Sequence, residues 1–436
     1  MTLILADWLV TSTDVEPRRD WGVRVVGDVI DAVGSSAELR QDHPDDEIVD
    51  AAGGVVLPGF VNAHVHLYGV LAHGIPVVEA PDGFWSFLDD YWWPAVEDVL
   101  DHEMIGAATD WVCAEMLRSG TTTFYDILEA PGSLPDALLV EKEIVENRGL
   151  RGMLSFEATE RAGPGIAELG LAENVKLIEA SRGSDLVSGL MCYHTTFTCS
   201  PDYIRRCFDL AAEHGVLTHA HCNEGVHEGR WCEENLGKRT LEHYADLGVA
   251  GPGFLASQCV QLSDREREII AETGVRVTHM PLANCEVGGG IAPIPELLAA
   301  GVTVGLGSDG YVNDFFEVMR GAFLLHKARL LDPGTMPAAT VLGLATEGGA
   351  NALGLDQVGR LDVGWSADLQ VVDGSFPTPL SPHNLFEQLV LWRNHTHVRD
   401  VMVAGEWQVR GGEVVDADLD RLRARTHEQA QRLWSA

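Results

Sequence analysis

The sequence predicts an α/β protein whose main domain is a (β/α)8 barrel, or TIM barrel, with a small β-sandwich built from both ends of the chain. Three observations predict this. From about residue 55, eight short apolar runs alternate with segments of helical period; polar side chains gather where these runs end; and the flanking segments read as short strands with Gly and Asp turns. A chain of 436 residues has room for a barrel of about 250 residues and a second module.

The eight runs are the predicted barrel strands. They occupy residues 54–60, 121–126, 151–157, 187–194, 216–224, 254–260, 275–281 and 302–309. Helices are expected between them, for example over "EMIGAATDWVCAEMLRSG", where Gly120 ends an apolar pattern of period three to four, and over "SDREREIIAETG", where Ser263 stands in the N-cap position.

The predicted domain boundaries follow from this alternation. We expect residues 1–54 to form the N-terminal part of the sandwich, 55–359 the metal-dependent barrel, and 360–436 the C-terminal part of the sandwich with a closing helix, "DRLRARTHEQAQRLW".

Composition excludes several classes of partner. The formal net charge is −36 and the chain has few lysines, so its surface repels nucleic acid and acidic membranes. No apolar run approaches the roughly 18 residues of a membrane span, and the apolar N-terminus lacks the basic region of a signal peptide. Eight scattered cysteines without a C-x-x-C pair are typical of a reduced compartment, so we expect a soluble, cytoplasmic protein.

The stretch "PGFVNAHVHL" places His64 and His66 at the end of a predicted strand. Side chains two residues apart in a strand point the same way, so both imidazoles can reach one metal ion. Together with His221 and Asp309 at two other strand ends, they would make an N3O ligand set for one divalent metal, zinc or alternatively iron, with a position left for water.

A metal in such a site lowers the pKa of its water to about 7 and so provides hydroxide at neutral pH. Glu224, three residues after His221, is the expected general acid/base. A second metal in such barrels usually needs a carboxylated lysine at a strand end. The lysines all lie in helix-like or loop segments, at positions 142, 176, 238 and 327, so one metal is expected.

Several stretches resemble landmarks of the amidohydrolase superfamily along nearly the whole chain: "LPGFVNAHVHL", "THAHCNE", "HMPLANCEVGGGIAPIPELLAAGVTVGLGSDG" and "GRLDVGWSADLQVVD". The similarity is to its mononuclear aminohydrolase branch, with the guanine, 8-oxoguanine and S-adenosylhomocysteine deaminases, the SsnA-like proteins and the chlorohydrolases.

This resemblance implies the same four metal ligands, and Glu224 as proton shuttle. It also implies substrate contacts from His194, His279 and Asn284. From the residues themselves, Trp85, Trp92 and Trp93 are expected either to stack on a flat substrate ring or to form a buried aromatic cluster under a loop.

The chain departs from the family pattern on the sixth strand. Relatives read H-C-V-H-L where this chain reads Gln258, Cys259, Val260, Gln261, Leu262. The missing first histidine orients the metal-bound hydroxide in relatives. A carboxamide can hydrogen-bond but carries no proton at neutral pH, so Gln258 is a catalytic position whose role is open.

The function predicted is hydrolytic deamination of an amino-substituted N-heterocycle, of purine, pterin, pyrimidine or triazine type, by a hydrolase acting on C–N bonds other than peptide bonds. Asp309 would hold the hydroxide and Glu224 would protonate the ring. The alternatives are removal of chloride, thiol or alkylamine from a similar ring, or a metal- or ligand-binding protein without turnover. The partner is a small molecule, and family analogy suggests a homo-oligomer, a dimer or larger.

Overall fold

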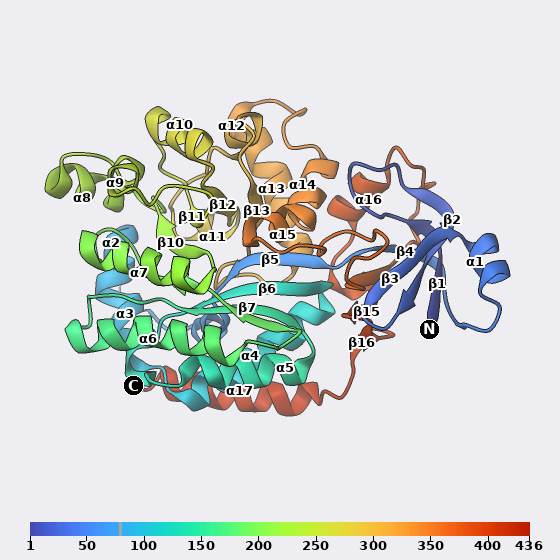
Figure 1. Cartoon of the computed structure of the whole chain (residues 1–436), viewed down its shortest axis with the longest axis horizontal. Helices are drawn as coiled ribbons and strands as arrows, with labels where there is room; N and C mark the ends of the chain where they lie inside the picture. Colours follow the sequence, from blue (N-terminus) through green and yellow to red (C-terminus); the bar gives the residue numbers. More distant parts are fainter. Residues whose placement is uncertain (78–80) are drawn as a thin grey trace.

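The computed structural model describes residues 1–77 and 81–436. Strands from the N-terminal segment and from residues 369–414 form one eight-stranded sheet, seen at one end of the molecule in Figure 1, with the order β17-β16-β15-β14-β4-β1-β2-β3. Only the β1–β4 pair is parallel. The strands are β1 (Thr2–Leu9), β2 (Arg18–Val26), β3 (Val29–Ser35), β4 (Glu47–Pro58), β14 (Leu369–Asp373), β15 (Val398–Val403), β16 (Glu406–Arg410) and β17 (Glu413–Val414). The predicted sandwich is therefore a single curved layer around its own buried apolar cluster.

The barrel is made from parallel strands arranged in two sheets, β5-β6-β7-β8 and β13-β12-β11-β10-β9. Bridges Val65–Asp309 and Ala158–Tyr193 join their edges and close the ring. The strands are β5 (Phe60–Val65), β6 (Thr121–Leu128), β7 (Arg151–Phe156), β8 (Val187–Gly189), β9 (Met191–Cys192), β10 (Thr218–Cys222), β11 (Phe254–Gln258), β12 (Arg276–His279) and β13 (Val304–Leu306). Strands β8 and β9 are two halves of the predicted fourth strand, so the predicted α/β barrel with an added β domain is confirmed.

One strand prediction was wrong in detail. The run 54–60 was expected to open the barrel, but Gly54 to Pro58 pair with β14 in the other sheet. The barrel begins only at Phe60, which pairs with Thr121. An apolar run buried on both sides looks the same in either sheet, so its pattern could not divide it. The first segment of the β domain thus extends to Pro58 rather than to residue 54.

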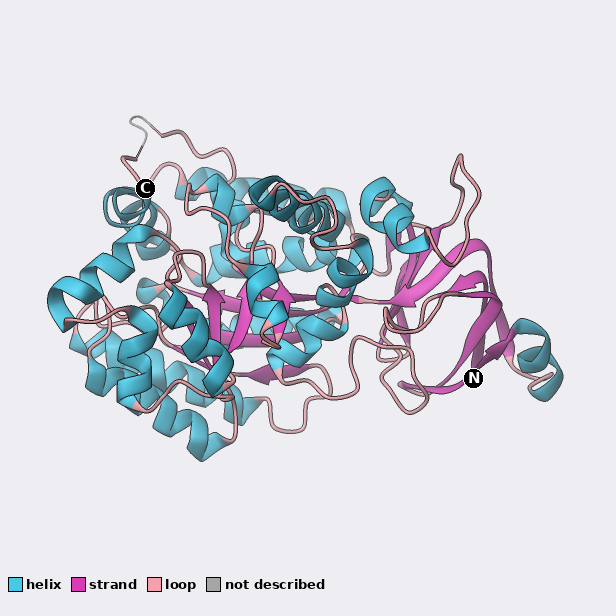
Figure 2. Cartoon of the chain, turned by 90° about the horizontal axis from the view of Figure 1, so that it is seen from above, coloured by secondary structure: helices cyan, strands magenta, loops and turns pink. Residues whose placement is uncertain are grey.

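Helices surround the barrel strands, as Figure 2 shows from above, with the eight-stranded sheet lying to one side. They are α4 (His102–Arg118), α5 (Ala137–Arg148), α6 (Pro164–Ala180), α7 (Pro201–His214), α8 (Val226–Leu236), α9 (Thr240–Leu247), α10 (Asp264–Thr273), α11 (Ala283–Glu286), α12 (Ile294–Ala299), α13 (Phe315–Leu330), α14 (Ala338–Leu344) and α15 (Glu347–Leu353). Outside this ring lie α1 (Ser36–Asp42), α16 (Leu385–Trp392) and α17 (Leu419–Leu433), and after β5 the short α2 (Phe84–Ser86) and α3 (Trp93–Ala95).

All three helices quoted from the sequence are present, as α4, α10 and α17. In α10, the Ser263 hydroxyl accepts a hydrogen bond from the Glu266 amide, as expected of an N-cap. The closing helix α17 runs from the sheet domain along the underside of the barrel beside α4 (Figure 1), where Thr426 donates to the carbonyl of Ala107. Among the described residues, no helix is both long and apolar enough to cross a membrane.

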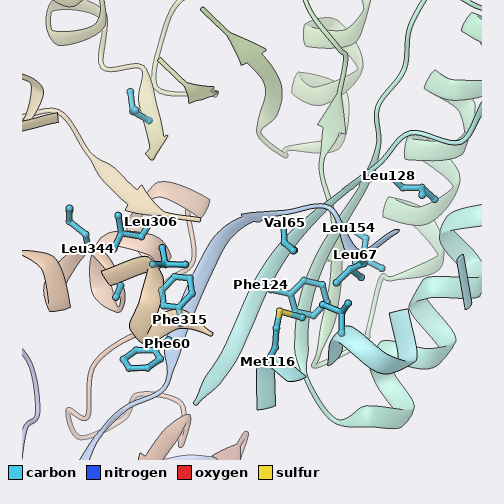
Figure 3. Close-up of a cluster of buried hydrophobic side chains, with 14 of the residues drawn as sticks. Phe60, Val65, Leu67, Met116, Phe124, Leu128, Leu154, Leu306, Phe315 and Leu344 are labelled. Atoms are coloured by element: carbon cyan, nitrogen blue, oxygen red, sulfur yellow. The ribbon is translucent and has the colours of Figure 1, made fainter. Parts of the chain in front are cut away.

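Large apolar side chains fill the space between strands and helices, as Figure 3 shows for Phe60, Phe124 and Phe315. The Phe60 ring lies 5.6 Å from that of Phe315 and 5.1 Å from that of Phe316. Each such burial stabilises the fold by roughly 1.5–3 kcal/mol. This packing anchors β5 at its start, so its far end, which carries the first histidines, is held rigidly.

Candidate active site

The carboxyl ends of β5, β10 and β13 bring together four of the predicted residues. His64, His66 and His221 can each place one ring nitrogen within 4.8 Å of the others. Asp309 joins them because the Val65–Asp309 bridge holds its backbone against β5; its Oδ1 lies 3.5 Å from His66 Nε2 and its Oδ2 lies 4.0 Å from His64 Nε2. A φ of +63° at Asp309 marks strained backbone at this point.

The hydrogen bonds of two imidazoles show that a cation fits between them. His66 Nδ1 lies 2.7 Å from the carbonyl of Ile127, and His221 Nδ1 lies 2.7 Å from Glu157 Oε1. Both partners only accept, so each Nδ1 carries a proton, and in the neutral ring, which is the form that binds a metal, each Nε2 presents a lone pair. These two Nε2 atoms face each other at 3.3 Å. Two lone pairs cannot bond to each other, whereas a metal ion between them satisfies both.

His64 points to the same conclusion. Its ring is fully buried, and neither nitrogen has a hydrogen-bond partner among the described residues. Burial lowers its pKa well below the ordinary value, with help from the neighbouring histidines, so the ring is the neutral form that binds metals. Three imidazole nitrogens and one carboxylate are the donor set of a catalytic zinc site.

Glu157 is a site residue that the sequence analysis did not identify. It is buried at the end of β7, where it fixes the orientation of His221 and also lies 3.8 Å from His194 Nε2. Burial acts to raise its pKa, but the adjacent His221 and His194 lower it below the ordinary value, so the group is a carboxylate. Its place at the end of the predicted strand 151–157 was the signal available in the sequence.

Gln258 occupies the position of the missing histidine and contacts Asp309. Its Nε2 donates to Asp309 Oδ2 at 2.7 Å, and the amide of Asn284 donates to its Oε1. The φ of Gln258 is +68°, which is uncommon for a residue with a side chain and directs the carboxamide into the site. Because both ends of the carboxamide are engaged, Gln258 holds the Asp309 carboxylate in one orientation.

A cavity of about 490 Å³ opens beside this cluster. Of the predicted residues, it is lined by His66, His194, His221, Glu224, Gln258 and Asp309. Burial raises the pKa of Glu224 to about 8, with a further contribution from the charge of Asp309, so this carboxyl group holds a proton at neutral pH. A proton donor and a metal-ligand cluster therefore border the same space.

Trp85 and Trp93 do not line this cavity, contrary to the predicted stacking role. Trp85 stacks on His227 at 4.2 Å, and Trp93 is buried beneath the guanidinium of Arg161 at 4.8 Å. A π-helical turn over Phe87–Trp92 changes the phase of this segment and turns Trp92 toward the cavity instead. The alternative of a buried aromatic cluster holds for Trp93, whereas Trp85 is exposed.

His279 and Asn284 also lie outside the cavity lining. His279 is buried and its Nε2 lies 3.0 Å from Nε2 of His326 on α13, while Asn284 contacts Gln258. Neither touches the space open to a substrate, so the implied contacts are corrected: Asn284 acts through Gln258, and His279 packs against α13. His194 does line the cavity, with its Nδ1 held 2.8 Å from the Thr198 hydroxyl, and its role in substrate binding stays a prediction.

Comparison with known proteins identifies the family. Residues 55–408 match the sequence profile described as Amidohydrolase family. The chain belongs to this family. It is 35% identical over 439 residues to a 5-methylthioadenosine/S-adenosylhomocysteine deaminase of Syntrophobacter fumaroxidans, covering 97% of this chain and 96% of the relative. A protein of the same name from Pelotomaculum thermopropionicum is 33% identical, with 95% of this chain and 94% of the relative covered.

Solved structures agree with this assignment. An adenosine deaminase from Xanthomonas campestris with bound zinc superposes with a TM-score of 0.90 at 28% identity, covering 100% of this chain and 99% of that one. The zinc complex of the atrazine chlorohydrolase TrzN from Arthrobacter aurescens gives a TM-score of 0.84 at 22% identity, covering 99% of this chain and 100% of that one, and bears on the fold alone.

These findings confirm the resemblance, the hydrolase class acting on C–N bonds and the divalent metal, zinc. The cytoplasmic location, the homo-oligomer, and the expected absence of nucleic-acid and membrane partners stay predictions.

Proposed function

We propose that this chain is a zinc-dependent deaminase of adenine nucleosides, with 5′-methylthioadenosine the first substrate to test. The observation that carries the proposal is the pair of facing Nε2 atoms on His66 and His221, which border a cavity that Glu224 also lines. The names of the curated relatives and of the zinc-bound structural neighbour support adenine nucleosides among the N-heterocycles predicted.

The reaction replaces the amino group at C6 of the purine with oxygen from water. A C–O bond forms at C6, the C–N bond breaks, and the nitrogen leaves as ammonia. Zinc, when bound by His64, His66, His221 and Asp309, supplies the Lewis acidity that makes water nucleophilic at neutral pH.

The chain's own groups handle protons and orientation. Glu224 is protonated at neutral pH and can give its proton to the ring nitrogen beside C6, which makes C6 more electrophilic. Gln258 donates to Asp309 and fixes that carboxylate, and Glu157 holds His221 through its Nδ1 proton. The side chains of Phe87, Trp92 and Phe197 line the cavity and offer apolar faces to a flat ring.

The test is ammonia release by the zinc-loaded protein from 5′-methylthioadenosine, adenosine, other aminopurines, pterins, pyrimidines and triazines. The matched control is Glu224→Gln, which keeps the size of the side chain and removes its acidity; we expect it to bind zinc and to lose roughly 10²–10⁴-fold in kcat. If no compound yields ammonia while about one zinc per chain is bound, the protein removes another leaving group or only binds.

A further inference from the structure

The cavity beside the zinc ligands is lined by carboxyl groups, and among the described residues neither lysine nor arginine lines it. The acidic lining residues are Glu97, Glu157, Glu224, Glu228, Glu286 and Asp309. Three of the four lining histidines are His66, His194 and His221, whose rings face the zinc site or Glu157. The fourth, His73, is held by the carbonyl of Gly310 at 2.8 Å from its Nε2.

The guanidinium of Arg161, which contacts the lining residue Glu97, is already engaged by three carboxyl groups. Arg161 donates from Nε to Glu129, from one terminal nitrogen to Asp98 at 2.9 Å, and from the other to Glu97 at 3.1 Å. Its face lies over the ring of Trp93. A substrate anion that reached this guanidinium would have to displace a buried carboxylate from it, at the cost of leaving that carboxylate unpaired.

The cavity also has an apolar wall. Its wall includes Ile75, Val77, Phe84, Leu88 and Tyr91. A neutral alkyl or thioether group gains free energy by leaving water for such a wall, whereas an unpaired carboxylate or phosphate loses its hydration without compensation.

We propose that this cavity selects nucleosides whose substituent carries no negative charge, and that it discriminates against those with a carboxylate or phosphate. This inference rests on the proposed function and sharpens it. It favours 5′-methylthioadenosine and adenosine over nucleotides, and over thioethers that end in a carboxylate.

Glu286 is the position at which a change of charge should weaken the discrimination against carboxylates. It lies at the end of α11, is exposed to solvent while lining the cavity, and forms no ion pair among the described residues. A substitution there changes the charge met by a substrate without removing a buried contact, so folding is preserved.

The experiment compares two thioadenosines that differ only in charge. One carries a carboxymethyl group on the 5′ sulfur and the other carries the carboxamide of the same shape; 5′-methylthioadenosine is the reference. At pH 8, where an ordinary imidazole is uncharged, we expect kcat/KM for the carboxylate to be at least about tenfold below that for the carboxamide. Glu286→Arg should reduce this ratio by about tenfold, and Glu286→Gln by less.

Each result has one interpretation. Equal turnover of carboxylate and carboxamide overturns the inference while the deaminase assignment stands. A preference that Glu286→Arg leaves unchanged means that the charge of the cavity lining does not set the discrimination, and also overturns the inference. If no adenosine compound yields ammonia, the proposed function fails and the inference falls with it.

Discussion

Two histidine pairs in the same barrel have nearly the same spacing and opposite chemistry. The Nε2 atoms of His66 and His221 are 3.3 Å apart, and those of His279 and His326 are 3.0 Å apart. In the first pair each Nδ1 donates its proton to an acceptor, so the neutral rings turn two Nε2 lone pairs toward each other. In the second, both Nδ1 atoms lack partners among the described residues, so one ring can carry its proton on Nε2 and donate it to the other.

The comparison shows that the hydrogen-bond partner of Nδ1 determines whether two facing Nε2 atoms can bind a metal or bond to each other. The Ile127 carbonyl and the Glu157 carboxylate give the first pair the ring orientation and tautomer that a metal site needs. Within the described part of the chain the second pair has no such acceptors, so His279 and His326 hydrogen-bond to each other within the buried contact between β12 and α13.

The largest expected effect is the difference in zinc content and activity between a variant that lacks a histidine of the first pair and one that lacks a histidine of the second. His66→Asn should lower the zinc content from about one to well below one per chain and reduce kcat/KM by at least about 10⁴-fold, because the nucleophile is lost. His279→Asn should retain the zinc. His326→Gln is the control for misfolding, because its carboxamide can still donate a hydrogen bond to His279, and it should retain the zinc as well. Metal analysis with an ammonia assay measures both; zinc loss in the His326 variant would contradict the distinction.

The second prediction concerns the acceptor on His221. Glu157→Leu removes it, which frees the Nδ1 proton and the orientation of the ring, so zinc affinity should fall by about 10–100-fold. Glu157→Gln keeps an accepting oxygen and should weaken binding less. Competition with a chromophoric chelator gives the affinities, and equal affinity in both variants would show that His221 does not depend on this contact.

The third prediction concerns Gln258, which orients Asp309 by a hydrogen bond of 2.7 Å. Gln258→Leu leaves the carboxylate free to turn, so kcat/KM should fall by roughly tenfold or more, as expected for loss of a hydrogen bond to a charged group. Zinc content should stay at about one per chain. An unchanged kcat/KM would mean that the carboxamide has no catalytic part.

The smallest effect is a pH dependence of stability that belongs to the second pair. Burial lowers the pKa of His326 to about 4. Its contribution to stability is complete above the unfolded pKa of about 6.5 and is lost as the pH falls from there through 4. Between pH 7.5 and 5.5 the wild type should lose about 1.4 kcal/mol more than His326→Gln in urea unfolding. Parallel pH profiles would contradict this assignment.

The sequence predicted the ligands because their chemistry is local. A His-x-His at a strand end and further ligand-type residues at other strand ends need only the period of a strand and the closure of a barrel. These rules brought His64, His66, His221 and Asp309 together, and they placed Glu224 beside them.

The errors lie where the outcome depends on packing. Of the three tryptophans expected at the substrate ring, only Trp92 faces the cavity, because a π-helical turn shifts the helical phase, which no residue pattern announced. His279 ends its strand as the ligands do, yet it meets His326 from a helix far along the chain. Glu157 also ends a predicted strand. Its role, however, depends on its contact with His221, which lies on a strand of the other parallel sheet, and the sequence does not show that contact.

The most direct test of the account is a zinc titration of chelator-treated protein while ammonia release from 5′-methylthioadenosine is followed. The account predicts that activity rises linearly and saturates at about one zinc per chain, and that Glu224→Gln binds the same amount without releasing ammonia. Ammonia release that is independent of zinc, or equal in the Glu224 variant, would contradict it.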